Sequence, residues 1–212
     1  MNKKRYFIII AAVCLLLNTC KKYNPVSFYE ENKNYPDGVV CAALYTKDLS
    51  LLREVIAMGG DVNFVHIGNI TPLMYAARIG NAKAVQLLLD RGADVHYVSS
   101  EKMTALDYAC ISDNSKCVQL ILAYGGNPNT FNEGDMTPLI SAITAGNRNI
   151  VRVLVENGAD INLKDKNGDT ALMYAVYTAQ MDIAKNLIKR GADPDLKNND
   201  GISARDLAKG KL

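Results

Sequence analysis

The chain has 212 residues, of which 49% are hydrophobic and 22% are charged. This composition supplies enough apolar side chains for a packed core, so disorder is not the default expectation. The formal net charge is only +2, whereas domains that bind nucleic acid usually carry a basic face or stripe. We therefore expect no nucleic acid partner.

The first 19 residues are typical of an export signal. Basic residues at positions 3–5 precede an apolar run over 7–17, and polar Asn18 and Thr19 follow. A helix over that run would rise only about 16 Å, roughly half the hydrocarbon thickness of a bilayer. The pattern favours a removed segment over a membrane-spanning helix. Its removal would leave 21 of the 24 basic residues against 22 acidic ones.

The end of this segment, Leu17 to Cys20, resembles a bacterial lipobox, which implies lipidation of Cys20 as the first mature residue. Thr19 departs from the small residue usual at its position, so simple secretion, an uncleaved anchor and a cytoplasmic protein stay as alternatives. Residues 20–37 have the polar, turn-prone composition of a tether. We expect an exported cell envelope lipoprotein, in the periplasm or at the outer membrane, that meets a membrane only through this N-terminal part.

One pattern then returns every 33 residues from about residue 38 to the end of the chain. A glycine column is followed two residues later by an acidic or amide column, and a Thr or Ser column precedes Pro or Ala in most units. The three columns are Gly59, Gly92, Gly125, Gly158 and Gly191; Asp61, Asp94, Asn127, Asp160 and Asp193; and Thr71, Thr104, Thr137, Thr170 and Ser203. Thr or Ser can cap a helix, which is worth about 1 kcal/mol, and glycine can end one. Each unit therefore predicts a helical hairpin followed by a turn.

The segments TPLMYAARIGNAKAVQLLLDRGADVH and TALMYAVYTAQMDIAKNLIKRGADPD resemble ankyrin repeats. The resemblance covers residues 38–212 and implies an all-α repeat solenoid of ankyrin-type helix-turn-helix units with β-turn fingers. About five repeats are expected, with a half-repeat cap at the C-terminus. Their bounds would lie near 38–66, 67–99, 100–132, 133–165, 166–198 and, for the partial unit, 199–212. The first unit departs from the pattern at Gly38, Val39 and Val40 and would be the N-terminal cap. Two capped ends favour a monomer.

Two further columns have structural interpretations. Small residues in the first helix of each unit are expected to let neighbouring helices approach closely; they are Ala76, Ala109, Ala142 and Ala175. Tyr75, Tyr108 and Tyr174 are interpreted first as an aromatic row between repeats and second as ligand-contacting side chains.

The resemblance also implies a protein-binding groove lined by the fingers and by the exposed side of each first helix. The matching positions are Ile67, Gly68, Ile70, Arg78, Ser100, Glu101, Met103, Ile111, Glu133, Met136, Thr144, Lys166, Asn167, Asp169 and Tyr177. Ile70, Met103 and Met136 form an apolar line beside polar neighbours, a mixture suited to burial and orientation of a partner. The alternative is that these three side chains cover turn backbone or fold inward.

Catalytic, metal and cofactor sites are not expected. His66 and His96 have no partner at ligand spacing. Asp165, Asn167 and Asp169 begin like a calcium-binding loop, but the glycine and glutamate that such a loop needs are missing. The sequence has no phosphate-binding loop or nucleophile motif, so we expect a non-enzymatic protein without a cofactor.

Cys110 and Cys117 should lie on facing helices of one hairpin. They could form a disulfide in an oxidising compartment or serve as buried small apolar side chains.

The sequence supports an interaction module that binds a protein partner. Two alternatives stay open: a structural or stress-protective periplasmic repeat protein without a specific partner, and a secreted effector that binds a host protein.

Overall fold

The computed structural model describes residues 44, 49–65 and 68–210 of the chain. The expected signal segment 1–19, the tether 20–37 with Cys20, and the candidate binding residue Ile67 lie outside the described residues.

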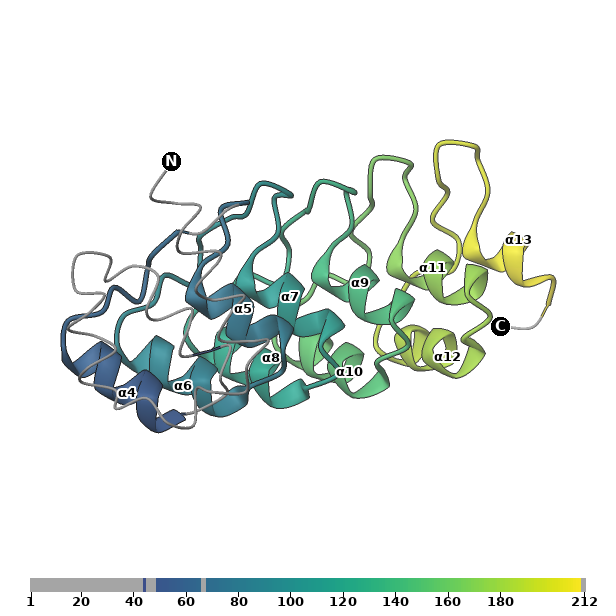
Figure 1. The fold of residues 1–212 in the computed structure, drawn as a ribbon. Helices are drawn as coiled ribbons and strands as arrows, with labels where there is room; N and C mark the ends of the chain where they lie inside the picture. The colour runs from purple at the N-terminus through teal and green to yellow at the C-terminus, as the bar shows by residue number, and fades with distance from the viewer. Residues whose placement is uncertain (1–43, 45–48, 66–67, 211–212) are drawn as a thin grey trace, which may run out of the picture.

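In the described part, helices alternate between two rows, which we call inner and outer (Figure 1). The inner helices are α5 (Pro72–Arg78), α7 (Ala105–Ile111), α9 (Pro138–Thr144), α11 (Ala171–Tyr177) and α13 (Ala204–Ala208). The outer helices are α4 (Leu49–Ala57), α6 (Ala82–Asp90), α8 (Ser115–Ala123), α10 (Arg148–Glu156) and α12 (Met181–Lys189). This arrangement confirms the predicted helical repeat solenoid, and α13 is the single helix expected after the last hairpin. None of the described helices has the length and hydrophobicity that crossing a membrane requires.

The column of Thr and Ser begins the inner helices as predicted. Thr71 Oγ1 accepts a hydrogen bond from the amide of Met74 at 3.3 Å, and Thr137 Oγ1 accepts one from Ile140 at 3.2 Å. The same cap recurs at Thr104, Thr170 and Ser203. Because a cap satisfies an amide that the helix itself cannot, each inner helix begins at a defined residue.

The loops that connect successive repeats stand above the inner row as fingers (Figure 1). The fourth and fifth fingers, 164–169 and 197–202, are closed by antiparallel bridges from Lys164 to Thr170 and from Lys197 to Ser203. Gly168 turns the fourth finger with a φ of +78°, and a Cβ there would lie 2.9 Å from the backbone nitrogen of Asn199. Glycine is therefore required at this turn both for its backbone conformation and for the close approach of the next finger.

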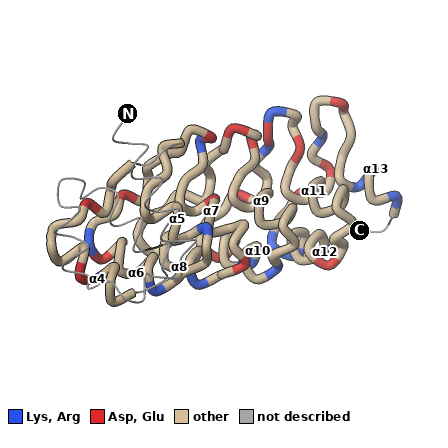
Figure 2. Tube along the Cα trace, viewed as in Figure 1, with Lys and Arg blue, Asp and Glu red and all other residues tan. Residues whose placement is uncertain are grey.

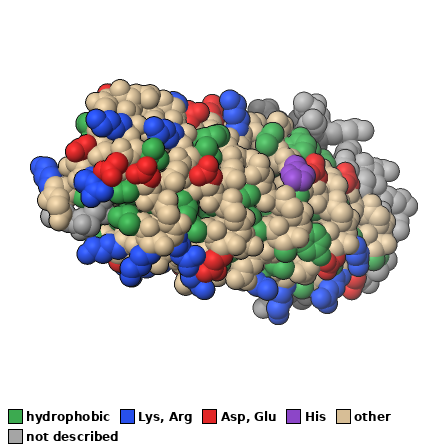
Figure 3. Space-filling view, turned by 180° about the vertical axis from the view of Figure 1, so that it is seen from behind, with side chains coloured by type: hydrophobic (Ala, Val, Ile, Leu, Met, Phe, Trp, Pro, Cys, Tyr) green, Lys and Arg blue, Asp and Glu red, His purple; other side chains and the backbone are tan. Residues whose placement is uncertain are grey.

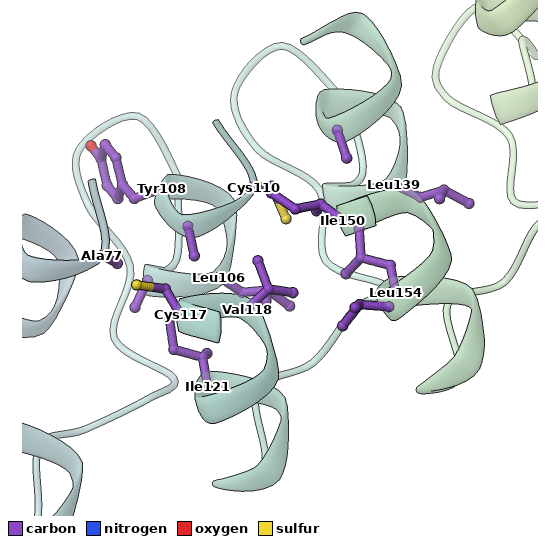
Figure 4. Packing of buried hydrophobic residues seen from close by; sticks show 14 of the residues in the cluster. Ala77, Leu106, Tyr108, Cys110, Cys117, Val118, Ile121, Leu139, Ile150 and Leu154 are labelled. Carbon is purple, nitrogen blue, oxygen red and sulfur yellow. The ribbon is translucent and has the colours of Figure 1, made fainter. Parts of the chain in front are cut away.

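The core lies between neighbouring hairpins, where apolar side chains of adjacent repeats meet. Ala76, Ala109, Ala142 and Ala175 are completely buried, as the prediction of close helix approach requires. In Figure 4, Val118 of α8 points toward Ile150 and Leu154 of α10. A larger side chain in the alanine column would overpack these interfaces at a cost of about 1–3 kcal/mol.

Cys110 and Cys117 lie on the two helices of one hairpin, α7 and α8, as expected, and both are buried free thiols (Figure 4). Burial raises the pKa of the Cys117 thiol to about 11. Burial, with a smaller contribution from the charge of Asp107, raises the pKa of Cys110 well above its usual value. The two cysteines therefore act as small apolar core residues, and no disulfide joins them.

A ladder of asparagine side chains ties the loop after one outer helix to the equivalent loop of the next repeat. Asn63 donates from Nδ2 to the carbonyl of Gly92 at 3.1 Å and accepts from the amide of Asp94 at 2.7 Å. Asn129 makes the same pair of bonds to Gly158 and Asp160 of the following repeat, and Asn162 makes it to Gly191 and Asp193. His96 occupies the equivalent position of the second repeat, and within the described residues it makes neither bond to the third repeat.

We expect His96→Asn to raise the free energy of unfolding by about 1 kcal/mol, because it restores a rung of the asparagine ladder. The reverse change at an intact rung, Asn129→His, should lower it by a similar amount. Urea denaturation of the two variants measures both effects. Equal stability of all three proteins would show that the ladder does not contribute.

Asp107 is a buried carboxyl in the first turn of α7. Its Oδ2 accepts from the amide and the hydroxyl of Thr104, whereas Oδ1 has no hydrogen-bond partner among the described residues. Burial raises the pKa of Asp107, and the bonds from Thr104 offset this only in part. Asp206 has the same capping bonds from Ser203 but is exposed, and its pKa is lowered, mainly by those bonds.

The two carboxyls therefore predict opposite effects on stability. Because the folded protein favours the neutral carboxyl of Asp107, this group adds to the free energy of unfolding below its unfolded pKa, about 3.9. That stabilisation is lost as the pH rises through the raised pKa of the folded state. Asp107→Asn should therefore stabilise the protein at pH 7, and the gain should shrink toward pH 4. Because the folded protein favours the carboxylate form of Asp206, this group stabilises the protein above the unfolded pKa, and the stabilisation is lost as the pH falls. Asp206→Asn should therefore destabilise the protein at pH 7. Thermal melts across this range test both signs, and a loss of stability at pH 7 in Asp107→Asn would contradict the assignment.

Candidate protein-binding surface

The fingers and the ends of the inner helices form one surface. Tyr177, the last residue of α11, donates from its hydroxyl to Asp169 Oδ1 of the preceding finger at 3.1 Å. Asp169 Oδ1 also accepts from Asn198 Nδ2 of the next finger at 2.8 Å. The equivalent pairs in earlier repeats are Arg78 with Ile70, Ile111 with Met103, and Thr144 with Met136. We call this region, made of residues 65, 68–70, 98–103, 131–136, 164–169 and 197–202 with the ends of α5, α7, α9 and α11, the finger–helix surface.

Backbone bonds and an ion pair hold the fingers beside one another. The amides of Ser100, Glu133 and Asn199 donate to carbonyls of the preceding fingers, on Gly68, Glu101 and Asn167, each at 2.9 Å. The third and fourth fingers are joined by Lys166 Nζ and Asp135 Oδ2 at 2.8 Å, and the bond to Asp135 raises the pKa of Lys166. The finger row is therefore a connected surface, not a set of independent loops.

Most residues predicted to bind a partner are exposed on this surface. They are Arg78, Ser100, Glu101, Ile111, Glu133, Thr144, Lys166, Asn167 and Tyr177, together with Gly68. Asp169 is buried by its bonds to Tyr177 and Asn198. Their role in binding stays a prediction, because exposure makes contact possible without identifying a partner.

The expected apolar line differs from the prediction. Ile70, Met103 and Met136 are half-buried and pack against the core. Each precedes the Thr that caps an inner helix, where the chain turns back into the repeat. These three side chains therefore largely fold inward, which was the alternative interpretation. Less of their surface is free for a partner than the apolar line predicts.

Sequence reasoning missed a second apolar column, at the first residue of the fingers. Val65, Val98 and Phe131 are 36%, 50% and 39% exposed, and they recur at the 33-residue period. Lys164 and Lys197 continue the column in the last two fingers. The same alignment that gave the glycine column contained this signal, but these positions were assigned to the turns between units.

Aromatic side chains support the surface from below. Tyr174 donates to Asp165 Oδ2 at 2.9 Å and packs edge-to-face on Tyr177, with ring centroids 6.1 Å apart. Burial, and then the bond to Asp165, raises the pKa of Tyr174 to about 12. Tyr108 is buried, and the Arg78 guanidinium lies 5.3 Å from the ring centroid of Tyr75. These contacts fit the interpretation of the tyrosines as a structural row.

The acidic residues of the fourth finger are occupied by internal donors. Asp165 Oδ1 accepts from the amides of Asn167 and Asp169, each at 2.8 Å. In the ranges that the structure describes, no three His, Cys, Asp or Glu side chains gather into a possible metal site. His96 is exposed on its loop, and His66 lies outside the described residues.

This geometry defines a helical repeat protein with an extended surface on one side. A family model described as "Ankyrin repeats (3 copies)" matches residues 39–132 and 125–198. The chain belongs to the ankyrin repeat family, whose repeats typically serve as non-catalytic interaction scaffolds.

Solved and curated relatives agree with this assignment. The crystal structure of EF0377, an ankyrin repeat protein, superposes with a TM-score of 0.76 at 28% identity, covering 84% of this chain and 93% of that one. Ankyrin repeat, SAM and basic leucine zipper domain-containing protein 1 of Atelerix albiventris is 38% identical over 71 residues, which are 34% of this chain and 14% of that protein. The Mus musculus protein of the same name is 47% identical over 49 residues, or 23% of this chain and 10% of that protein. The matches therefore span only a small part of these curated relatives.

A glutamate substitution should lower the free energy of unfolding more at half-buried positions of the finger–helix surface than at exposed ones. Met103→Glu should lower the free energy of unfolding by about 1–3 kcal/mol, because it places a carboxylate against the core. Ile111→Glu, at a side chain that is 48% exposed, should change it by less than about 0.5 kcal/mol. Chemical denaturation distinguishes the two, and equal losses would contradict the assigned burial.

Proposed function

We propose that this chain is a non-enzymatic interaction module that holds a protein partner on its finger–helix surface. The observation that carries the proposal is the exposure of large apolar side chains at repeat-equivalent places on the fingers and inner helices. Val98 and Phe131 share one such column, and Ile111 and Tyr177 share another, with exposures of 39–50%. Single exposed apolar residues are ordinary on protein surfaces, but columns of them along one connected face suit a docking site.

The physics of such a surface favours a protein as the occupant. Burial of a fully exposed Val, Ile or Phe contributes about 1.5–3 kcal/mol, and these side chains, which are 36–50% exposed, have about half of that left to gain. A cluster of them can still supply much of the binding energy. The polar neighbours Arg78, Glu101 and Glu133 are exposed and can orient the partner. The apolar column changes to Lys164 and Lys197 in the last two fingers, so the partner should place its more polar part there.

Site-specific photo-crosslinking tests this proposal. A photoreactive phenylalanine analogue at position 111 should give a discrete adduct with a partner protein in cells of the source organism. The same analogue at Gln119, exposed on outer helix α8, should give none. Phe131→Glu should abolish the adduct at position 111 without lowering the melting temperature. Equal labelling at position 119, or no effect of Phe131→Glu, would contradict the proposal.

We also propose that the protein is exported and held at the cell envelope through Cys20. The support is in the sequence alone: basic residues at 3–5, the apolar run 7–17, and Leu17 three residues before the cysteine. The tether 20–37 would then separate the repeat domain from the membrane.

Intact mass spectrometry of the full-length gene product, recovered from its native membrane and soluble fractions, tests this localisation. The expected mass begins at Cys20 and includes added acyl chains, and Cys20→Ser should remove them. An unprocessed mass beginning at Met1 would overturn both the signal and the anchor.

A further inference from the structure

The charges of the chain, nearly balanced in sequence, are separated in space. The outer helices, with the residues that cap their C-terminal ends, carry nine basic residues against four acidic ones. The basic set is Arg53, Lys83, Arg91, Lys116, Arg148, Arg152, Lys185, Lys189 and Arg190, and the acidic set is Glu54, Asp90, Glu156 and Asp182. The rest of the described chain has the opposite balance, with 14 acidic residues against seven basic ones.

The figures show the same separation. Asp and Glu are concentrated on the fingers and loops of the Cα trace (Figure 2). Seen from behind, Lys and Arg line the lower edge, which is the row of outer helices, and a second group lies at the upper left, toward the C-terminal end (Figure 3). We call this row, α4, α6, α8, α10 and α12 with their C-terminal capping residues, the outer edge.

Ion pairs within the outer edge neutralise only part of its positive charge, and nine basic against four acidic residues leave a net charge of +5. Glu156 lies near both Arg190 and Arg152, and Asp182 pairs with Arg148 at 2.6 Å. Asp90 accepts hydrogen bonds from Tyr124 and Gln86. The charge of Arg91 interacts with the neighbouring Asp90 carboxylate. Five exposed basic side chains have no carboxylate partner among the described residues: Arg53, Lys83, Lys116, Lys185 and Lys189.

We infer that the outer edge docks on an anionic lipid surface. The five unpaired charges are spread over helices that lie side by side along the stack (Figure 1), a geometry suited to a flat surface. Four of the five are lysines, which act as flexible point charges, and mobile anionic lipids can gather beneath each one. Tyr124, 43% exposed at the end of α8, is of the residue type enriched at membrane interfaces.

This geometry fits a membrane better than a nucleic acid. Outer helices that are packed side by side present no single protruding element that could enter a groove and read bases. Docking through the outer edge would also leave the finger–helix surface free for a protein partner. The inference goes beyond the proposed function and does not depend on it.

Vesicle binding of the full-length Cys20→Ser variant, which lacks the proposed acyl anchor, tests the inference. The protein is mixed with vesicles of phosphatidylcholine alone and with vesicles that also contain phosphatidylglycerol, and bound protein is separated by flotation. Each basic side chain near an anionic surface contributes about a fivefold gain in partition at low salt. Lys83→Glu with Lys116→Glu, two equivalent and exposed positions, should therefore reduce binding to the anionic vesicles at least about 25-fold.

The matched control is Lys102→Glu with Lys197→Glu, which changes the net charge equally on exposed finger positions. It should retain binding within about threefold, and melting curves should show both double variants folded. A neutral pair, Lys83→Gln with Lys116→Gln, should lie between the Cys20→Ser parent and the reversed pair. Equal loss in the finger control, equal binding to both vesicle types, or displacement from vesicles by duplex DNA at equal phosphate concentration would overturn the inference.

Discussion

Burial of apolar side chains between neighbouring repeats is the interaction on which the rest of this structure depends. A two-helix unit cannot bury its apolar face alone, so each hairpin is stable only against the next. The completely buried column of Ala76, Ala109, Ala142 and Ala175 sets how closely successive inner helices approach. Because the same contact recurs at each step, the fingers are brought to a common spacing at which their backbones can bond to one another.

Polar interactions then fix the alignment of neighbouring loops and the first residue of each inner helix, which apolar burial alone does not specify. The asparagine ladder aligns the loops, and capping side chains mark where each inner helix begins. The result is an apolar interior with two different faces. The interfaces are apolar, the finger–helix surface mixes apolar columns with polar groups, and the outer edge is basic. A binding module with this organisation can hold one partner on its fingers while its opposite edge contacts something else.

The fold could be predicted almost entirely from the sequence, because the 33-residue period carries structural information at each position. Thr71 and its equivalents predicted caps, Gly92 and its equivalents predicted helix ends, and the structure confirms both. The site was less predictable, since exposure depends on how each finger turns back into its repeat. Ile70, Met103 and Met136 looked free but pack inward, while Val98 and Phe131 were overlooked and are exposed.

Charge showed the same limit of sequence reasoning. A net charge near zero argued against a basic face, but positions 83, 116 and 185 are exposed on outer helices whereas most acidic residues fall in loops and fingers. Only the helical hairpin converts that alternation along the chain into separation across the molecule.

Native-state hydrogen exchange of the full chain tests the central role of the inter-repeat interfaces most directly. If the repeats are stable only through their neighbours, amides of α7, α8, α9 and α10 should share one high protection and exchange together, with protection falling toward α13. Hairpins that exchange at independent rates, or protection in α13 as high as in α9, would contradict this account.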